Sequence, residues 1–180
     1  MPSRRKFLSS SGAALVGTGI AGCLSGKNTR SAEWLQLKAI SVKWSRDGRS
    51  YSDQILQLMS DGEDEIRGTV ASEYNDVISS PSEVTASGSF HNDLQFDFEA
   101  IKYVVGFCGS DFSSDDESGC LNTRTSREDF NAVQFGDQAD VEVTDNQFHI
   151  HDVQSESISE WDTDISRFEL SEKHDYLVTK

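Results

Sequence analysis

One stretch near the middle of the chain constrains the fold more than any other. Over residues 101–108, every second side chain as far as position 107 is apolar: Ile101, Tyr103, Val105 and Phe107. Successive side chains of a β-strand point to opposite faces of its sheet, so residues two apart share a face. This stretch is also the most apolar part of the chain beyond residue 23. It therefore predicts a central β-strand that ends at a cysteine, Cys108.

A second signal is a hairpin around the Asp-Asn pair at residues 145–146. Alternating apolar residues flank this pair on both sides. Asp and Asn favour such turns because they tolerate a positive φ. A two-residue turn pairs Val143 with Phe148, and Val141 with Ile150, on one face of the hairpin.

Further turn signals divide the chain into short segments. Residues 45–48 are typical of a turn, and Asp-Gly at 61–62 separates two apolar runs, 55–59 and 66–71, as in another hairpin. Both runs also fit helices, because their apolar residues recur at spacings of three and four. We favour strands. Residues 94–98 predict a half-buried strand with Leu, Phe and Phe on one face.

The ends of the folded region show mixed patterns. Residues 34–44 alternate in two halves, and the switch near Ala39 indicates a β-bulge or a strand buried on both faces. Residues 158–168 suit a short helix, while Phe168 and Leu170 suit a last strand. Many short strands with turns about every 8–12 residues are typical of sandwiches and barrels. We therefore predict a mainly-β domain, an antiparallel β-sandwich (immunoglobulin-like or jelly-roll-like) with one or two short helices.

The first 23 residues have the three parts of an export signal. A basic front at residues 4–6 is followed by an apolar run of small residues, then by Ala-Gly before Cys23. The run over residues 7–21 is shorter than the ~20 apolar residues that a membrane-spanning helix needs. Its three serines and three glycines dilute it further.

Two short motifs in this leader resemble processing signals. Residues 3–8, SRRKFL, resemble the twin-arginine export motif, whose receptor reads Arg4 and Arg5; the resemblance implies export of a folded protein. Residues 20–23, IAGC, resemble a lipobox, which implies that the Cys23 thiol receives a lipid and becomes the new N-terminus. Two acyl chains hold a protein firmly, at about 0.8 kcal/mol for each buried methylene. A plain signal peptide with a chance cysteine is the alternative.

The remainder of the chain is strongly acidic. The leader contains three of the 16 basic residues and no acidic one, so 13 basic and 31 acidic residues remain, a net charge of −18. Such self-repulsion weakens a compact state in dilute buffer, whereas molar salt shortens the screening length to about 3 Å. Acidity, scarce lysines and the leader together resemble a haloarchaeal surface protein. An ordinary acidic or partly disordered protein is the alternative. The charge disfavours nucleic acid and anionic headgroups as partners.

Two cysteines remain if Cys23 carries lipid. Cys108 and Cys120 then form an even pair outside the cytoplasm, which indicates a disulfide. A bridge that closes so short a loop stabilises the fold by about 3 kcal/mol in the chain-entropy model. Free thiols or metal ligands are the alternatives, although no second cysteine pair supports a zinc site.

These features divide the chain into three parts. We expect residues 1–22 to be a twin-arginine signal peptide, residues 23–33 the lipidated cysteine with a flexible tether, and residues 34–180 a single mainly-β extracytoplasmic domain. The expected location is the extracytoplasmic face of the cell membrane, held by the lipid. The export machinery and the membrane are thus the first expected partners.

The best candidates for metal ligands lie on the hairpin around residues 145–146: Asp140, Glu142, His149 and His151. The predicted register places Glu142 opposite His149, and Asp140 opposite His151. Imidazole and carboxylate groups suit zinc, copper or nickel. The alternative is a set of opposite-charge pairs across a solvated face, each worth about 0.2–1 kcal/mol. We expect no cofactor unless this site holds a metal ion.

The loop between the two later cysteines offers a second set of oxygen ligands, suited to calcium: Asp111, Asp115, Asp116 and Glu117. Its spacing departs from an EF-hand, because Asp116 stands where the glycine should be. Solvation of an acidic surface is the alternative.

Sequence motifs for catalysis do not emerge. The chain lacks the G-x-S-x-G, H-E-x-x-H, P-loop and G-x-G-x-x-G patterns. Four histidines offer a general base, but no nucleophile is placed near them by the sequence: His91, His149, His151 and His174. We therefore expect a binding or structural role in the envelope, with a protein or a small solute as partner. The alternatives are a metal- or solute-binding accessory protein and an enzyme with a non-motif site.

Overall fold

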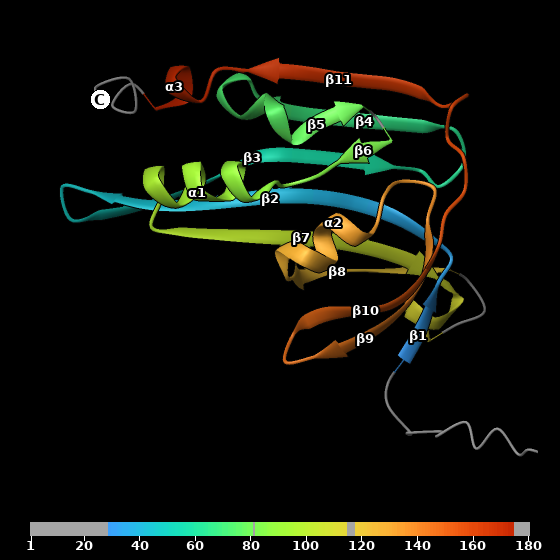
Figure 1. Cartoon of the computed structure of the whole chain (residues 1–180). Helices are drawn as coiled ribbons and strands as arrows, with labels where there is room; N and C mark the ends of the chain where they lie inside the picture. The colour runs from blue at the N-terminus through green and yellow to red at the C-terminus, as the bar shows by residue number, and fades with distance from the viewer. Residues whose placement is uncertain (1–28, 81, 115–117, 175–180) are drawn as a thin grey trace, which may run out of the picture.

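The computed structural model describes residues 29–80, 82–114 and 118–174. In these residues nine strands form one large sheet (Figure 1): β1 (Thr29–Ala32), β2 (Trp34–Arg46), β3 (Arg49–Ser60), β4 (Glu65–Ala71), β7 (Ala100–Gly109), β8 (Gly119–Thr125), β9 (Gln138–Thr144), β10 (Gln147–Gln154) and β11 (Asp162–Phe168). Strands β5 (Ile78–Ser80) and β6 (Glu83–Val84) form a small second sheet. The helices are α1 (Gly88–Asp97), α2 (Arg127–Ala132) and α3 (Leu170–Lys173), with 3₁₀ turns η1 (Ser72–Val77) and η2 (Ser110–Phe112). The predicted leader, with Arg4, Arg5 and Cys23, lies outside the described residues.

The order of strands in the large sheet is β1-β9-β10-β8-β7-β2-β3-β4-β11. Strand β7 contains the predicted central segment, and it lies between β2 and β8. Most neighbouring strands are antiparallel, but β8 with β10 and β4 with β11 are parallel. The sheet is therefore mixed rather than fully antiparallel.

The fold has two layers, and the prediction of a mainly-β chain with short helices is confirmed. Helices α1 and α2 and the β5–β6 sheet lie over one face of the large sheet (Figure 1). The core fills the space between these layers, with fully buried side chains such as Ile40, Leu58 and Phe107. The architecture is thus sandwich-like, with helices and a two-stranded sheet in place of a second large sheet. We call the opposite side of the large sheet the uncovered face.

Turn chemistry explains the hairpin between β2 and β3. Asp47 and Gly48 both have positive φ, 52° and 73°, and Arg46 pairs directly with Arg49. This two-residue turn matches the natural twist of paired strands. Of the two alternatives near Ala39, burial on both faces is confirmed, because all four residues 37–40 are buried. The register shift between Ile40 and Ser41 comes from an extra residue of β3, Ile55, and the bulge of β2 itself lies at Gln36. The hairpin predicted around residues 61–62 is also confirmed, as β3 and β4.

The strand predicted over residues 94–98 is wrong, because these residues belong to helix α1 and its C-terminal end. The side chain of Ser87 accepts a hydrogen bond from the Phe90 N–H at 3.1 Å and so caps the first turn. Phe90 and Leu94, four residues apart, then share the buried face of the helix. Phe96, which a strand would place beside Leu94, is 81% exposed.

The flexible tether predicted for residues 23–33 is wrong at its C-terminal end. Residues 29–32 form β1, which pairs with β9 from Thr29 opposite Glu142 to Ala32 opposite Ala139. The Ser31 N–H also donates to the Asp111 carboxylate at 2.8 Å. An edge strand is held mainly by backbone hydrogen bonds, so it forms here without an apolar repeat that a sequence pattern could reveal.

In the C-terminal region the helix considered for residues 158–168 does not form, and the last strand forms earlier than predicted, with Leu170 beyond its end. Residues 162–168 form the last strand, β11, which pairs with β4, and the short helix α3 follows at once. In the described part of the chain, no helix is long and apolar enough to cross a bilayer.

Two substitutions in α1 test the helical assignment. We expect Leu94→Ala to lower the free energy of unfolding by about 2–5 kcal/mol, because it opens a cavity in the core. Phe96→Ala should cost less than about 1 kcal/mol, since most of this ring is exposed. Thermal or denaturant unfolding followed by circular dichroism measures both. Equal losses would favour a strand that buries both side chains.

Candidate functional site

The hairpin predicted around residues 145–146 forms as β9 and β10. Asp145 and Asn146 both adopt positive φ, 54° and 57°. Val143 pairs with Phe148, as predicted, and Phe148 is fully buried. Glu142 lies opposite His149, which confirms this half of the predicted register.

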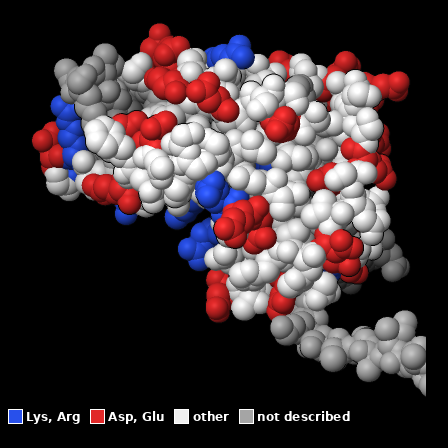
Figure 2. Space-filling model, in the orientation of Figure 1, with Lys and Arg blue, Asp and Glu red and all other residues white. Residues whose placement is uncertain are grey.

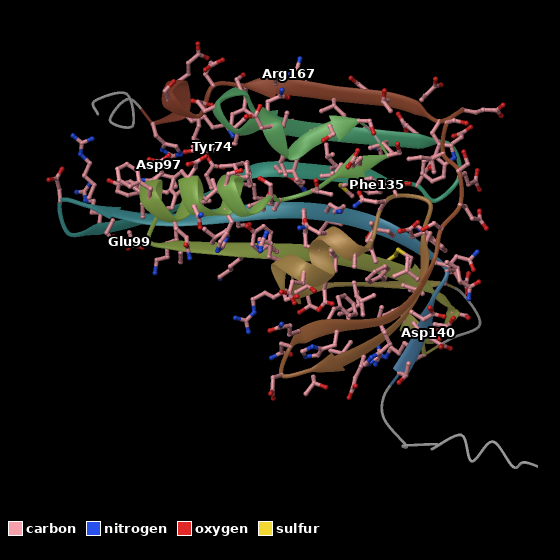
Figure 3. The ribbon with its side chains drawn as sticks, in the orientation of Figure 1. Tyr74, Asp97, Glu99, Phe135, Asp140 and Arg167 are labelled. Atoms are coloured by element: carbon pink, nitrogen blue, oxygen red, sulfur yellow. A yellow bond between two sulfur atoms is a disulfide. The ribbon has the colours of Figure 1, made fainter. Side chains whose placement is uncertain are left out.

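The other half of that register is wrong. A β-bulge between Ile150 and Asp152 leaves Asp140 opposite Asp152, and His151 unpaired in the ladder. The extra residue turns the His151 ring toward Glu142, with 3.2 Å between Nε2 and Oε2. Asp140 lies instead on β9 beside β1 (Figure 3).

The metal candidates thus form one imidazole–carboxylate contact. Across residues 29–80, 82–114 and 118–174, no group of three or more His, Cys, Asp or Glu is arranged to hold a metal ion. This contact, in which Glu142 also accepts from the Thr144 hydroxyl, matches the alternative interpretation, a cross-strand pair worth a few tenths of a kcal/mol. For the calcium prediction, Asp111 binds the backbone of β1. Residues 115–117 lie outside the described residues.

Cys108 and Cys120 form the predicted disulfide. They are directly opposed residues of the neighbouring strands β7 and β8. The same end of the sheet is tied to β1, because the Glu33 N–H donates to the Cys108 carbonyl at 2.8 Å. The disulfide therefore fastens the two central strands at the end where the described chain begins.

The structure pairs one of the predicted general bases with a tyrosine. His91 Nδ1 lies 2.8 Å from the Tyr103 hydroxyl, at the edge of a surface hollow of about 390 Å³ that Glu99 also lines. Burial raises the pKa of Tyr103 to about 12. Its phenol therefore stays protonated near neutral pH, and the pair is better suited to holding α1 against β7 than to proton transfer.

The feature that our sequence reasoning missed is a buried lysine in the middle of the sheet. Lys38 on β2 has no solvent exposure. Its ammonium group donates to the Val84 carbonyl at 2.7 Å, the Val133 carbonyl at 2.7 Å and Gln134 Oε1 at 3.3 Å. The nitrogen also lies 4.3 Å from the centroid of the Phe130 ring. Three donors thus meet three acceptors, as a buried ammonium group requires.

The signal for this lysine was present in the sequence. Position 38 shares the covered face of β2 with Ile40, Val42 and Trp44, so the alternation alone assigns it to the core. A buried lysine with a lowered pKa can act as a nucleophile when substrate reaches it. Because the Lys38 side chain is enclosed, we interpret it as a structural contact between layers.

The uncovered face of the sheet carries a different set of charges. By the observed registers, the charged side chains on this face of β2, β3, β7 and β8 are Lys43, Lys102 and Arg124. All three are basic and exposed. No described carboxylate lies within ion-pairing distance, 4.0 Å, of any of them. By contrast, Asp and Glu are spread widely over the covered side (Figure 2).

A surface groove of about 340 Å³ lies next to two of these cations. Its lining residues come from β2, β3 and the start of β7: Ser41, Val42, Lys43, Ser50, Tyr51, Ser52, Ala100 and Lys102. Small side chains dominate the lining, and the two lysines flank it. Hydroxyl and ammonium groups around a hollow of this size suit the binding of a polar ligand.

Searches of protein-family models, of curated proteins and of solved structures found no match to the chain.

The buried lysine predicts how stability changes with pH. Burial lowers the pKa of Lys38 from 10.5 to about 7, while the Asp137 carboxylate acts in the opposite direction. Between these pH values the unfolded chain binds more protons than the folded one, so the free energy of unfolding should rise with pH. The slope is at most about 1.4 kcal/mol per pH unit. Denaturant unfolding at pH 7, 8 and 9 measures it, and a flat or falling trend would contradict the prediction.

The matched variant is Lys38→Met, which keeps an unbranched side chain one atom shorter and removes its charge. We expect this change to abolish the pH trend between pH 7 and 9. It should also lower the free energy of unfolding by about 2–4 kcal/mol, because the Val84 and Val133 carbonyls lose their buried donor. A variant as stable as the parent would show that the ammonium group is not needed to hold the layers together.

Proposed function

We propose that the chain is a lipid-anchored, extracytoplasmic binding protein of a haloarchaeon, which contacts its partner through the uncovered face of the sheet. The observation that carries the binding role is the groove between the exposed Lys43 and Lys102, over which no helix or strand of the described residues lies. The leader motifs with Arg4, Arg5 and Cys23 support export and attachment to the membrane. The Cys108–Cys120 disulfide adds weaker support, because such bonds persist outside the cytoplasm.

The length of chain after the anchor supports this arrangement. Five residues, 24–28, separate Cys23 from β1, and they span at most about 20 Å. A lipid on Cys23 would therefore keep the β1 end of the sheet close to the membrane. Strand β2 starts at this end and carries Lys43 nine residues beyond Trp34, or roughly 30 Å at about 3.3 Å per residue. The groove would then lie at the end of β2 away from the bilayer, where an envelope partner can reach it.

The small number of ion pairs on the described surface supports the proposal that the protein is adapted to high salt. Ion pairs between described residues are few, and most involve exposed side chains, for example Arg67 with Glu65 at 3.3 Å. The excess of carboxylates therefore repels itself in dilute buffer, and salt relieves this repulsion.

The lipid anchor has a direct test. In native membranes, or after expression in a haloarchaeal host, mass spectrometry should find Cys23 as the N-terminal residue with its thiol lipidated. Cys23→Ser should release the protein from the membrane fraction, because the acyl chains no longer bind the bilayer. Arg4→Lys with Arg5→Lys should retain the protein in the cytoplasm. An intact leader or an unmodified Cys23 thiol would disprove the anchor.

Salt dependence is tested on the folded domain. Because screening relieves the repulsion, we expect the melting temperature to rise and the transition to sharpen between dilute buffer and molar NaCl. Sucrose at matched osmolarity is the control, since it does not screen charge. Unchanged stability across the salt series would contradict the halophilic assignment.

A further inference from the structure

We propose that Lys43, Lys102 and Arg124 form a binding site for an acidic polysaccharide, one whose sugars carry carboxylate groups. This inference rests on the proposed function, because it names the ligand of the uncovered face. It is carried by the arrangement of the three cations across the strands, by the chemistry of the adjacent groove and by the distribution of charge between the two faces.

The three cations form a diagonal row across neighbouring strands. Lys43 on β2 is opposite Ala100 of β7, and Lys102 lies two residues further along that strand. Arg124 on β8 is opposite Val104 of β7, again two residues beyond Lys102. Each cation is therefore displaced from the previous one by one strand and by two residues along the strand. The side chains of such diagonal neighbours start about 7–8 Å apart. A row of this kind fits an extended polymer that carries repeated negative charges, better than it fits one small anion.

The groove supplies the contacts that a sugar needs. Three serines line it, Ser41, Ser50 and Ser52, and each offers a hydroxyl that can donate and accept. Serine hydroxyls complement the hydroxyls of a sugar ring, while the flanking Lys43 and Lys102 can meet its carboxylate. An acidic peptide would instead rely on apolar side chains for anchoring. The two large apolar residues of the lining belong to the covered face, where Val42 is buried and Tyr51 stacks on Trp44, so they offer a peptide no such anchor.

The distribution of charge favours an anionic ligand on this face. The chain has 31 acidic residues, yet on the uncovered face the charged strand positions of β2, β3, β7 and β8 are all basic. Two carboxylates near this region already have partners: Glu99 accepts from the Ser45 hydroxyl at 3.0 Å, and Glu65 on β4 pairs with Arg67. Local attraction therefore acts against the general repulsion between this protein and anions. At molar salt the screening length of about 3 Å removes long-range attraction but leaves ion pairs in direct contact. An anionic lipid headgroup is disfavoured, because the anchor would hold the opposite end of the sheet at the bilayer.

Binding to polygalacturonate oligomers tests the site, measured by isothermal titration at the lowest salt concentration that keeps the far-ultraviolet circular dichroism native. We expect saturable binding, weakened about tenfold or more in the triple variant Lys43→Gln, Lys102→Gln, Arg124→Gln. The matched control is Arg67→Gln. Arg67 is a basic residue of β4 on the same face, and it already pairs with Glu65. Its affinity should equal that of the parent. The circular dichroism of all variants is compared, since the substituted side chains are exposed.

Three results would overturn the site: no binding of polygalacturonate by the parent domain, equal binding by the triple variant, or equal binding of neutral dextran. If poly-glutamate binds as tightly as polygalacturonate, the ligand class that we propose would be wrong, and an acidic peptide would take its place. Lipidation of Cys23 and the salt dependence of stability are measured independently of ligand binding. Failure of the binding site is therefore distinguishable from failure of the proposed function.

Discussion

The hydrogen bonds of Lys38 connect the two layers of this fold. The ammonium group on the central strand β2 meets the end of β6 through the Val84 carbonyl, and the segment after α2 through Val133 and Gln134. Gln134 Oε1 also accepts from the Val84 N–H at 2.9 Å, so the two covering segments are joined to each other as well as to the sheet. Burying a charge is costly unless every donor has a partner. The backbone carbonyls of the covering layer must therefore stay within hydrogen-bonding distance of the Lys38 ammonium group. This requirement fixes the position of the layer over the sheet more precisely than apolar packing alone would.

This one-sided cover has a consequence for function. Helices α1 and α2 and the β5–β6 sheet all lie on one face of the large sheet (Figure 1). On the opposite face, Lys43, Lys102 and Arg124 are exposed, whereas Leu37 and Ala39 near the start of β2 are buried. Lysine thus has two roles on one strand: Lys38 is enclosed among carbonyl groups, while Lys43 stands exposed beside a groove. Odd and even positions of β2 point to opposite faces, so the same strand serves the core and the proposed binding surface. The Cys108–Cys120 disulfide fastens the end of the sheet remote from that groove.

The sequence predicted those parts of the fold in which local chemistry and pattern agree. Strand β7, the turn at Asp47-Gly48 and the hairpin at Asp145-Asn146 follow from alternation and from residues that tolerate positive φ. Helix α1 was missed because Leu94, Phe96 and Phe98 imitate a strand, and the cap at Ser87 decides otherwise. Strand β1 depends on pairing with distant β9, which no local pattern contains. At the candidate sites, one bulged residue was enough to separate Asp140 from His151, and the diagonal of Lys43, Lys102 and Arg124 depends on long-range register.

Amine labelling of the folded domain tests the two-faced sheet most directly. A brief reaction with an N-hydroxysuccinimide ester, followed by peptide mass spectrometry, compares the modification rates of lysines on both faces. We predict rapid labelling of Lys43 and Lys102 and strong protection of Lys38, and this protection should be lost when the domain is unfolded in denaturant. Labelling of Lys38 at the rate of Lys43 in the folded protein would contradict the claim that one face is enclosed and the other is open.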